Sequence, residues 1–67
     1  MKLHQVNFLI PAGFLEERAD HIRITANKVE LTGKKSITTD QSQHQVLADG
    51  VLIDIGYDIT SIVEISP

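Results

Sequence analysis

The alternation of apolar and polar residues predicts that most of this chain forms short β-strands. In the segment LHQVNFLI, residues 3–10, apolar residues recur at Val6, Phe8 and Ile10, with polar side chains at Gln5 and Asn7. A period of two residues is typical of a strand with one buried face. We expect Pro11 to end this strand, because proline has no N–H group to donate to a neighbouring strand, and residues 12–13 to form a turn.

The following segment, FLEERADHI (residues 14–22), is compatible with two structures. Leu15, Ala19 and Ile22 are spaced i, i+4 and i+7, which would place them on one face of a helix. Two glutamates would lie favourably near the N-terminus of that helix. A helix of about two turns is marginally stable alone and has to pack on a sheet. The sequence therefore leaves open whether residues 13–20 form a short α-helix or a strand.

A β-hairpin is the strongest local prediction, over residues 21–33 (HIRITANKVELTG). If Asn27 and Lys28 form a two-residue loop, the apolar residues of both strands share one face and the polar residues share the other. Asparagine suits the positive φ of the first loop position, whereas lysine is less apt than glycine at the second. The apolar face would contain Ile22, Ile24, Ala26, Val29 and Leu31.

The middle of the chain is rich in turn signals. Gly33 and the two lysines after it predict a turn into a short strand around Ile37. The polar segment QSQHQ, residues 41–45, has no periodicity and is expected to be a loop. Asp49 and Gly50 form a strong turn dipeptide between two apolar runs.

The last strands are predicted within residues 51–65, where every second residue is apolar or aromatic except Ser61. A single strand of that length would exceed the usual limit of about ten residues, so we expect a bend at residues 56–58. A three-residue loop there places Leu52 opposite Ile62 on the outward face. This apolar spot is either a contact with another subunit or is covered by another part of the same chain.

Together these elements predict a mainly β fold in a single small domain, residues 1–67. We expect a small antiparallel sheet or barrel of about five or six short strands joined by hairpins, with one short α-helix near residues 13–20 as an option. A core of this size contributes roughly 3–5 kcal/mol, so short domains usually need a disulfide, a metal or a partner subunit. Because the chain has no cysteine, a partner subunit is the leading candidate.

Charge is unevenly distributed along the chain. Residues 1–35 contain all six lysines and arginines, whereas residues 36–67 contain five acids and no basic side chain. Such segregation can orient subunits against each other, or it can mean only that both faces are solvated. The orienting charges would be Arg23, Lys34 and Lys35 on one side and Asp54, Asp58 and Glu64 on the other.

Residues that could support catalysis or metal binding are sparse. His4, His21 and His44 are too far apart in the sequence for a compact ligand motif. The segment at Gly33 lacks the glycine five residues upstream that a Walker-type phosphate loop requires. Ser42 alternates with a histidine in a polar loop, without the fixed base and dry pocket that a nucleophile needs. We therefore expect no enzyme activity, no cofactor and no metal.

Nucleic-acid binding is the alternative function. The hairpin at residues 22–35 carries Arg23, Lys28 and two further lysines, and a two-stranded ribbon can enter a DNA groove. The net charge of -3 and the presence of only one tyrosine and two phenylalanines argue against a nucleic-acid surface.

We expect a non-enzymatic assembly or protein-interaction module that acts as a homo-oligomer, of the kind found among bacterial accessory proteins and phage structural proteins. Its partners would be other copies of the chain, with another protein as a second option. The N-terminal apolar run is too short and too polar for a signal peptide or a membrane span, which favours a cytoplasmic protein with no membrane partner. The predicted interface contains Leu52, Ile62, Tyr57, Asp54, Asp58, Glu64, Arg23, Lys34 and Lys35.

Overall fold

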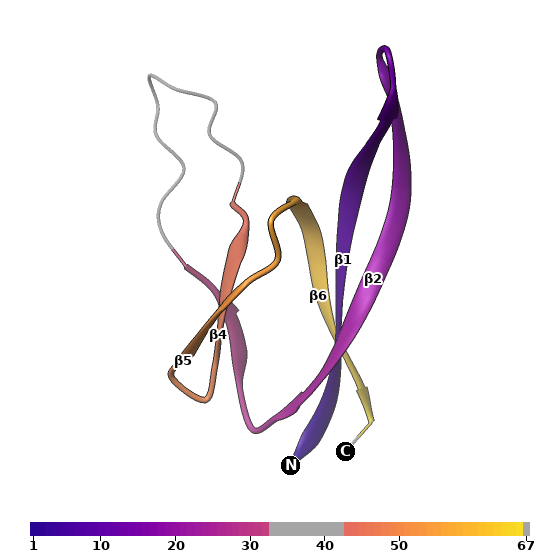
Figure 1. The fold of residues 1–67 in the computed structure, drawn as a ribbon. Helices are drawn as coiled ribbons and strands as arrows, with labels where there is room; N and C mark the ends of the chain where they lie inside the picture. Colours follow the sequence, from indigo (N-terminus) through magenta and orange to yellow (C-terminus); the bar gives the residue numbers. More distant parts are fainter. Residues whose placement is uncertain (33–42, 67) are drawn as a thin grey trace.

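The computed structural model of the protein describes residues 1–32 and 43–66, which form six β-strands and no helix (Figure 1). The mainly β prediction is therefore confirmed. The strand expected around Ile37 lies outside the described residues, as do Lys34 and Lys35. The strands are β1 (Lys2–Gly13), β2 (Glu16–Ala26), β3 (Val29–Leu31), β4 (Gln45–Ala48), β5 (Val51–Asp54) and β6 (Asp58–Ser66).

The strands form two antiparallel sheets of three, in the orders β2-β1-β6 and β3-β4-β5. The chain passes from one sheet to the other at two corners, between β2 and β3 and between β5 and β6 (Figure 1). Each of these bent segments pairs with β1 on one side of its corner and with β4 on the other. This is the strand order of a small barrel, in which strands change sheets at corners.

The hairpin predicted around Asn27 and Lys28 does not form. β2 pairs with β1, with Val6 opposite Ile22, and β3 pairs with β4. Residues 27–28 are therefore a corner between the sheets and not a two-residue loop. The alternation of apolar residues correctly predicts strands here. It does not specify which strand each one pairs with, because any neighbouring strand with an apolar face would fit. In the described residues, β2 and β3 therefore do not pair with each other as the two-stranded ribbon expected for the nucleic-acid alternative.

The pairing predicted across residues 56–58 is also wrong. Leu52 lies opposite Leu47 of β4, and Ile62 lies opposite Val6 of β1, so the two side chains belong to different sheets. The bend itself is confirmed, because β5 ends at Asp54 and β6 begins at Asp58. The bend is a corner between the sheets because β5 pairs with β4 and β6 pairs with β1, and not with each other.

Residues 13–20 do not form a helix. β1 continues through Pro11 to Gly13, and β2 begins at Glu16, so these two strands form a long hairpin with Phe14 and Leu15 at its tip. Pro11 is tolerated because β6 no longer pairs with β1 beyond Leu9, which leaves that side of β1 as an edge. A register shift between Pro11 and Gly13 accommodates the end of the hairpin.

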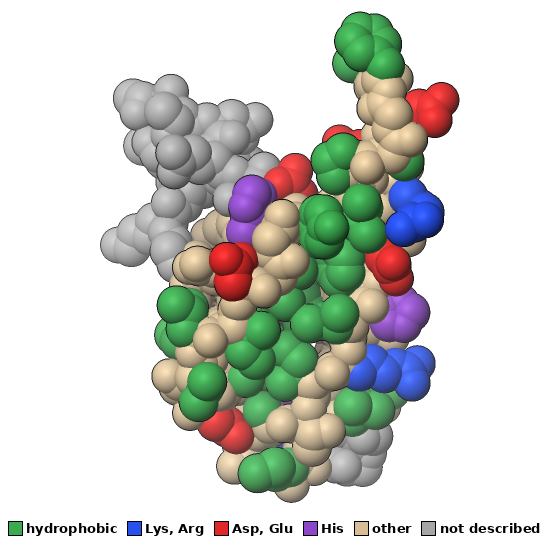
Figure 2. All heavy atoms as spheres, viewed as in Figure 1, with side chains coloured by type: hydrophobic (Ala, Val, Ile, Leu, Met, Phe, Trp, Pro, Cys, Tyr) green, Lys and Arg blue, Asp and Glu red, His purple; other side chains and the backbone are tan. Residues whose placement is uncertain are grey.

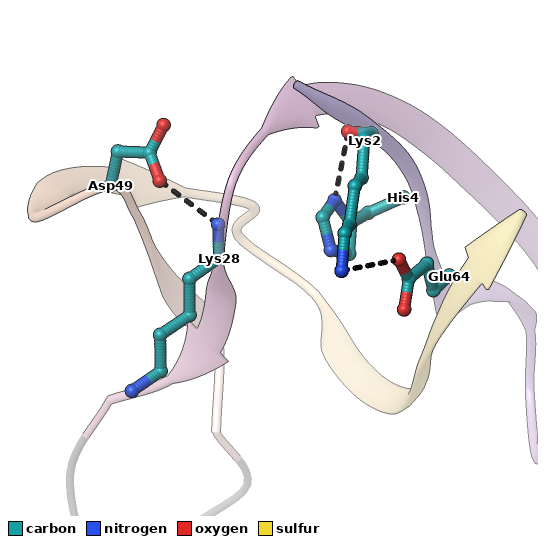
Figure 3. Close-up of polar contacts among 5 residues, drawn as sticks. All are labelled: Lys2, His4, Lys28, Asp49 and Glu64. Carbon is teal, nitrogen blue, oxygen red and sulfur yellow. Dashed lines mark hydrogen bonds and ion pairs between the residues drawn. The ribbon is translucent and has the colours of Figure 1, made fainter. Parts of the chain in front are cut away.

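The turn predicted at Asp49 and Gly50 is confirmed between β4 and β5, with Ala48 opposite Val51. Both turn residues have positive φ, 50° and 81°, as a two-residue hairpin turn of type I′ requires. The Asp49 carboxylate accepts hydrogen bonds from the backbone N–H groups of Asn27 (3.0 Å) and Lys28 (2.9 Å; Figure 3). These two bonds lower the pKa of Asp49 below its ordinary value of 3.8.

The core lies between the central strands of the two sheets. Val6 and Phe8 of β1 are buried, as are Val46 and Ala48 of β4 and Ala26 at the end of β2. His4 is buried beside them, and its Nδ1 atom donates a hydrogen bond to the carbonyl oxygen of Lys2 at 3.1 Å (Figure 3). A core this small leaves several large apolar side chains on the edge strands exposed.

Candidate interaction site

The outer half of the β1–β2 hairpin projects away from the two sheets (Figure 1). All ten residues from 11 to 20, which we call the arm, are exposed. The tip carries two adjacent apolar side chains, of which Phe14 is 92% exposed and Leu15 is 91% exposed. The backbone of Leu15 has a φ of 61°, in the left-handed region that bulky residues rarely enter. The tip therefore presents apolar surface to solvent on a strained turn.

A hollow of about 210 Å³ lies at the base of the arm. It is lined by residues of β1 and β2, by His44, which precedes β4, and by the corner between β5 and β6. In Figure 2, hydrophobic side chains run from the base of the arm down the middle of the visible face. A histidine and an acidic side chain lie next to each other to the left of this band, on the side away from the arm. The lining residues are Leu9, Pro11, Glu17, His44, Gly56, Tyr57 and Asp58.

The corner between β5 and β6 is held by hydrogen bonds from the backbone N–H groups of Ile55 and Gly56. The N–H groups of Ile55 and Gly56 donate to the carbonyl oxygen of His44, at 2.8 and 3.3 Å. The N–H group of Gly56 also donates to the Asp54 carboxylate at 2.9 Å. Gly56 has a φ of 80°, which glycine adopts without strain. These bonds fix the direction in which the next residue, Tyr57, leaves the corner.

Tyr57 forms the wall of the hollow nearest the core. Its ring stacks on Phe8 with a centroid separation of 5.5 Å and an angle of 10° between the ring planes. Such a pair is worth about 0.5–1.5 kcal/mol beyond the apolar area that it buries. Since one face of the tyrosine ring covers Phe8, the remaining surface of the ring is left to line the hollow.

His44 and Asp58 form the polar side of the hollow. The Nε2 atom of His44 donates to Oδ1 of Asp58 at 2.7 Å, which orients the imidazole ring. None of the seven lining residues is a serine, threonine, cysteine or lysine, so the pair faces no such nucleophile among them. Within residues 1–32 and 43–66, no group of three or more histidine, cysteine or acidic side chains could hold a metal ion.

The described residues of the predicted interface lie on both sheets and at the corner between β5 and β6. Tyr57 and Asp58 line the hollow. Leu52 is exposed on β5, opposite Leu47, whereas Ile62 is half-buried beside the core residue Val6. The structure therefore brings two of the predicted residues to one site and separates the two aliphatic residues.

The charged residues of the predicted interface are also dispersed. Arg23 is exposed on β2, opposite Gln5 of β1. Glu64 forms an ion pair with Lys2, with 3.1 Å between the charged atoms (Figure 3). The carboxylates of Asp54 and Asp58 accept hydrogen bonds from the corner and from His44, as described above. All three acids therefore have a partner within the chain.

Sequence reasoning missed the arm and most of the hollow. Phe14 and Leu15 were assigned to a segment that could pack as a helix, although Gly13 before them is a turn signal. Two adjacent apolar residues between that glycine and Glu16 could have indicated the tip of a hairpin. The contribution of His44 to the hollow had no signal, because it depends on a corner formed by residues far along the chain.

Comparisons with known proteins found no similar one. No protein-family model matches the chain, and neither a curated protein nor a solved structure shows significant similarity to it. In the part of the chain that the structure describes, no helix is long and apolar enough to cross a membrane.

Proposed function

We propose that this protein is a non-enzymatic assembly module that associates with further copies of itself. The observation that carries the proposal is the arm, whose ten residues are all exposed. A two-stranded ribbon that packs on nothing is marginally stable in water. An element of this kind gains stability when a partner covers it, and two apolar side chains at its tip favour burial.

The small core supports the same proposal. The buried apolar side chains of the described residues are Val6, Phe8, Ala26, Val46 and Ala48. Large apolar side chains remain exposed on the edge strands, including Leu52 of β5 and Val63 and Ile65 of β6. Small domains without disulfides commonly gain the missing burial from a second subunit.

The two edge strands of the β2-β1-β6 sheet differ in charge. β2 carries Glu16, Glu17, Arg18, Asp20 and Arg23, and charged side chains protect an edge from pairing with other chains. β6 carries only two acids, Asp58 and Glu64, between which all residues are uncharged. The charged edge of β2 favours association through side chains at the tip of the arm over open-ended strand pairing along it.

Sedimentation velocity over a dilution series from nanomolar to high micromolar concentration tests this function. We expect an oligomer at the upper end that dissociates on dilution, because burial of the exposed apolar side chains depends on mass action. A protein that stays monomeric and folded over the whole range would contradict the proposal. Far-UV circular dichroism at each end of the range would report whether the chain is folded.

A further inference from the structure

We propose that Phe14 at the arm tip of one copy fills the hollow at the arm base of a second copy, and that the exchange is reciprocal about a twofold axis. This inference rests on the proposed self-association and names the two surfaces that make it. The tip donates Phe14 and Leu15, and the hollow presents Leu9, Pro11 and Tyr57 as its apolar wall.

The size of the hollow fits one aromatic ring. Its volume is about 210 Å³, whereas an apolar cavity of about 150 Å³ is large enough to bind benzene. The ring of Phe14 is 92% exposed, so it can enter such a hollow without leaving other contacts in its own chain. Inside it, the ring would meet the part of Tyr57 that does not cover Phe8, in the offset or edge-to-face geometry that aromatic pairs prefer.

A tip cannot reach the hollow of its own chain. Five residues of extended strand separate Leu9, which lines the hollow, from Phe14, which corresponds to roughly 17 Å at about 3.3 Å per residue. The register between β1 and β2 continues to the pair of Gly13 and Glu16, so the arm stays extended along this length. Figure 1 accordingly shows the tip far from the corner between β5 and β6.

The same spacing makes a reciprocal exchange possible. If two arms lie side by side in opposite directions, each tip comes to lie at the base of the other arm. A twofold axis that passes between the two arms, level with the midpoint between Leu9 and Phe14, produces this arrangement. Such an interface is isologous: the same two surfaces are used by both copies, so the assembly closes as a dimer. It also covers the arm, whose residues 11–20 are all exposed in the single chain.

The backbone of the tip supports a binding role. Leu15 is held at a φ of 61°, although a leucine in the left-handed region is unfavourable. Residues held in such conformations cluster at sites of function. Here the strained turn carries two adjacent apolar side chains at the exposed tip. A glycine or asparagine at position 15 would make the same turn with less strain, but it would offer no apolar group for a partner to bury.

Disulfide trapping between two single-cysteine variants tests the geometry. The natural chain has no cysteine, so Phe14→Cys in one copy and Glu17→Cys in a second, differently tagged copy introduce one thiol each. A disulfide needs Cα atoms about 4.4–6.8 Å apart. Under mild oxidation we expect the mixed 14–17 disulfide to exceed both the 14–14 and the 17–17 species. A predominance of 14–14 disulfides would indicate a tip-to-tip contact and overturn the exchange.

The affinity of self-association gives an independent test. Phe14→Ser is expected to raise the dissociation constant about a hundredfold or more, because two buried rings are lost per dimer and each is worth about tenfold or more. The matched control is Val51→Ser, which removes an exposed apolar side chain from β5, outside the arm and the hollow. We expect the control to associate like the natural chain.

The outcomes separate this inference from the proposed function. If the natural chain dissociates on dilution but Phe14→Ser leaves its dissociation constant unchanged, the chain self-associates through another surface and the exchange is wrong. If the natural chain is a monomer at every concentration of the dilution series, both proposals fail. The arm would then have to bind a different protein. Circular dichroism of Phe14→Ser checks that the variant is folded, as expected for a side chain with so little contact to its own chain.

Discussion

The Asp49 carboxylate accepts a hydrogen bond from the backbone N–H of Lys28 at 2.9 Å and so joins the turn between β4 and β5 to the corner between β2 and β3. A second bond, from Asn27 at 3.0 Å, uses the other carboxylate oxygen. The contact is reinforced by the N–H of Asp49, which donates to the carbonyl oxygen of Lys28 at 2.9 Å. Asp49 thus fixes residues 27–28, the corner at which the chain passes from the β2-β1-β6 sheet to the β3-β4-β5 sheet.

Asp49→Asn is expected to destabilise the fold. The amide side chain keeps one acceptor oxygen but presents an NH₂ group to the second backbone donor, which then loses its partner. Asparagine also tolerates the positive φ of this position, so the backbone turn is preserved. We expect a lower midpoint of urea unfolding, and a larger decrease for Asp49→Ala, which lacks both oxygens and is strained at this φ. Equal midpoints for all three proteins would contradict the role given to the carboxylate.

The same carboxylate makes stability depend on acid pH. Hydrogen bonds from Asn27 and Lys28 lower the pKa of Asp49 in the folded state below the 3.8 of the unfolded chain. Its contribution is therefore complete above pH 3.8 and is lost as the pH falls through the folded-state pKa. Urea unfolding of the natural chain and of Asp49→Asn between about pH 6 and pH 2 should show a difference in midpoint that narrows only at the acid end. A difference that stayed constant would refute the linkage.

Gly50→Ala is expected to cost about 1 kcal/mol or more, because alanine is strained at the φ of 81° found there. A Cβ atom at this position would have no heavy atom within 4 Å, so the cost is purely conformational. Gly50→Asn is the control: asparagine enters the left-handed region more readily and should cost less. Thermal unfolding of the two variants would measure the difference in stability between them. If Gly50→Asn were the less stable variant, the φ of this position would not account for the cost.

Val6→Ala is expected to destabilise the fold by about 2 kcal/mol, since it removes two methyl groups from a fully buried position on β1. Val51→Ala is the matched control, because Val51 is 63% exposed on β5 and its truncation should change stability by no more than about 0.5 kcal/mol. Chemical denaturation of both variants would test the position of the core. Equal losses would place the core elsewhere.

Leu15→Asn is expected to stabilise the monomer while weakening self-association. Relief of the strained φ should contribute up to about 1 kcal/mol, whereas loss of the leucine side chain removes apolar surface from the tip. Leu15→Ala separates the two effects, because it removes the side chain and keeps the strain. Unfolding would be measured in the Phe14→Ser background, and association in the natural one. If Leu15→Asn strengthened association, the tip would not be the contact surface.

Part of the candidate site could be inferred from local sequence. The bend at residues 56–58 was predicted, and Tyr57 and Asp58 within it line the hollow. The arm was not recognised because Leu15, Ala19 and Ile22 happen to have helical spacing. In the structure Leu15 lies at the tip of the hairpin and Ile22 lies opposite Val6 in β2, so the spacing reflects no helical face.

The sequence by itself determined that the fold is mainly β and where the tightest turn lies, but not whether residues 13–20 are strand. Alternation along β1 and the Asp49–Gly50 dipeptide act through local geometry, which neighbouring residues specify. Only the tertiary structure decided which strands pair, and hence that residues 27–28 and 56–58 are corners. A pair such as Val6 and Ile62 joins strands at opposite ends of the chain. Alternation indicates which face of a strand is buried. The strand that it pairs with depends on how much apolar surface all six described strands bury together.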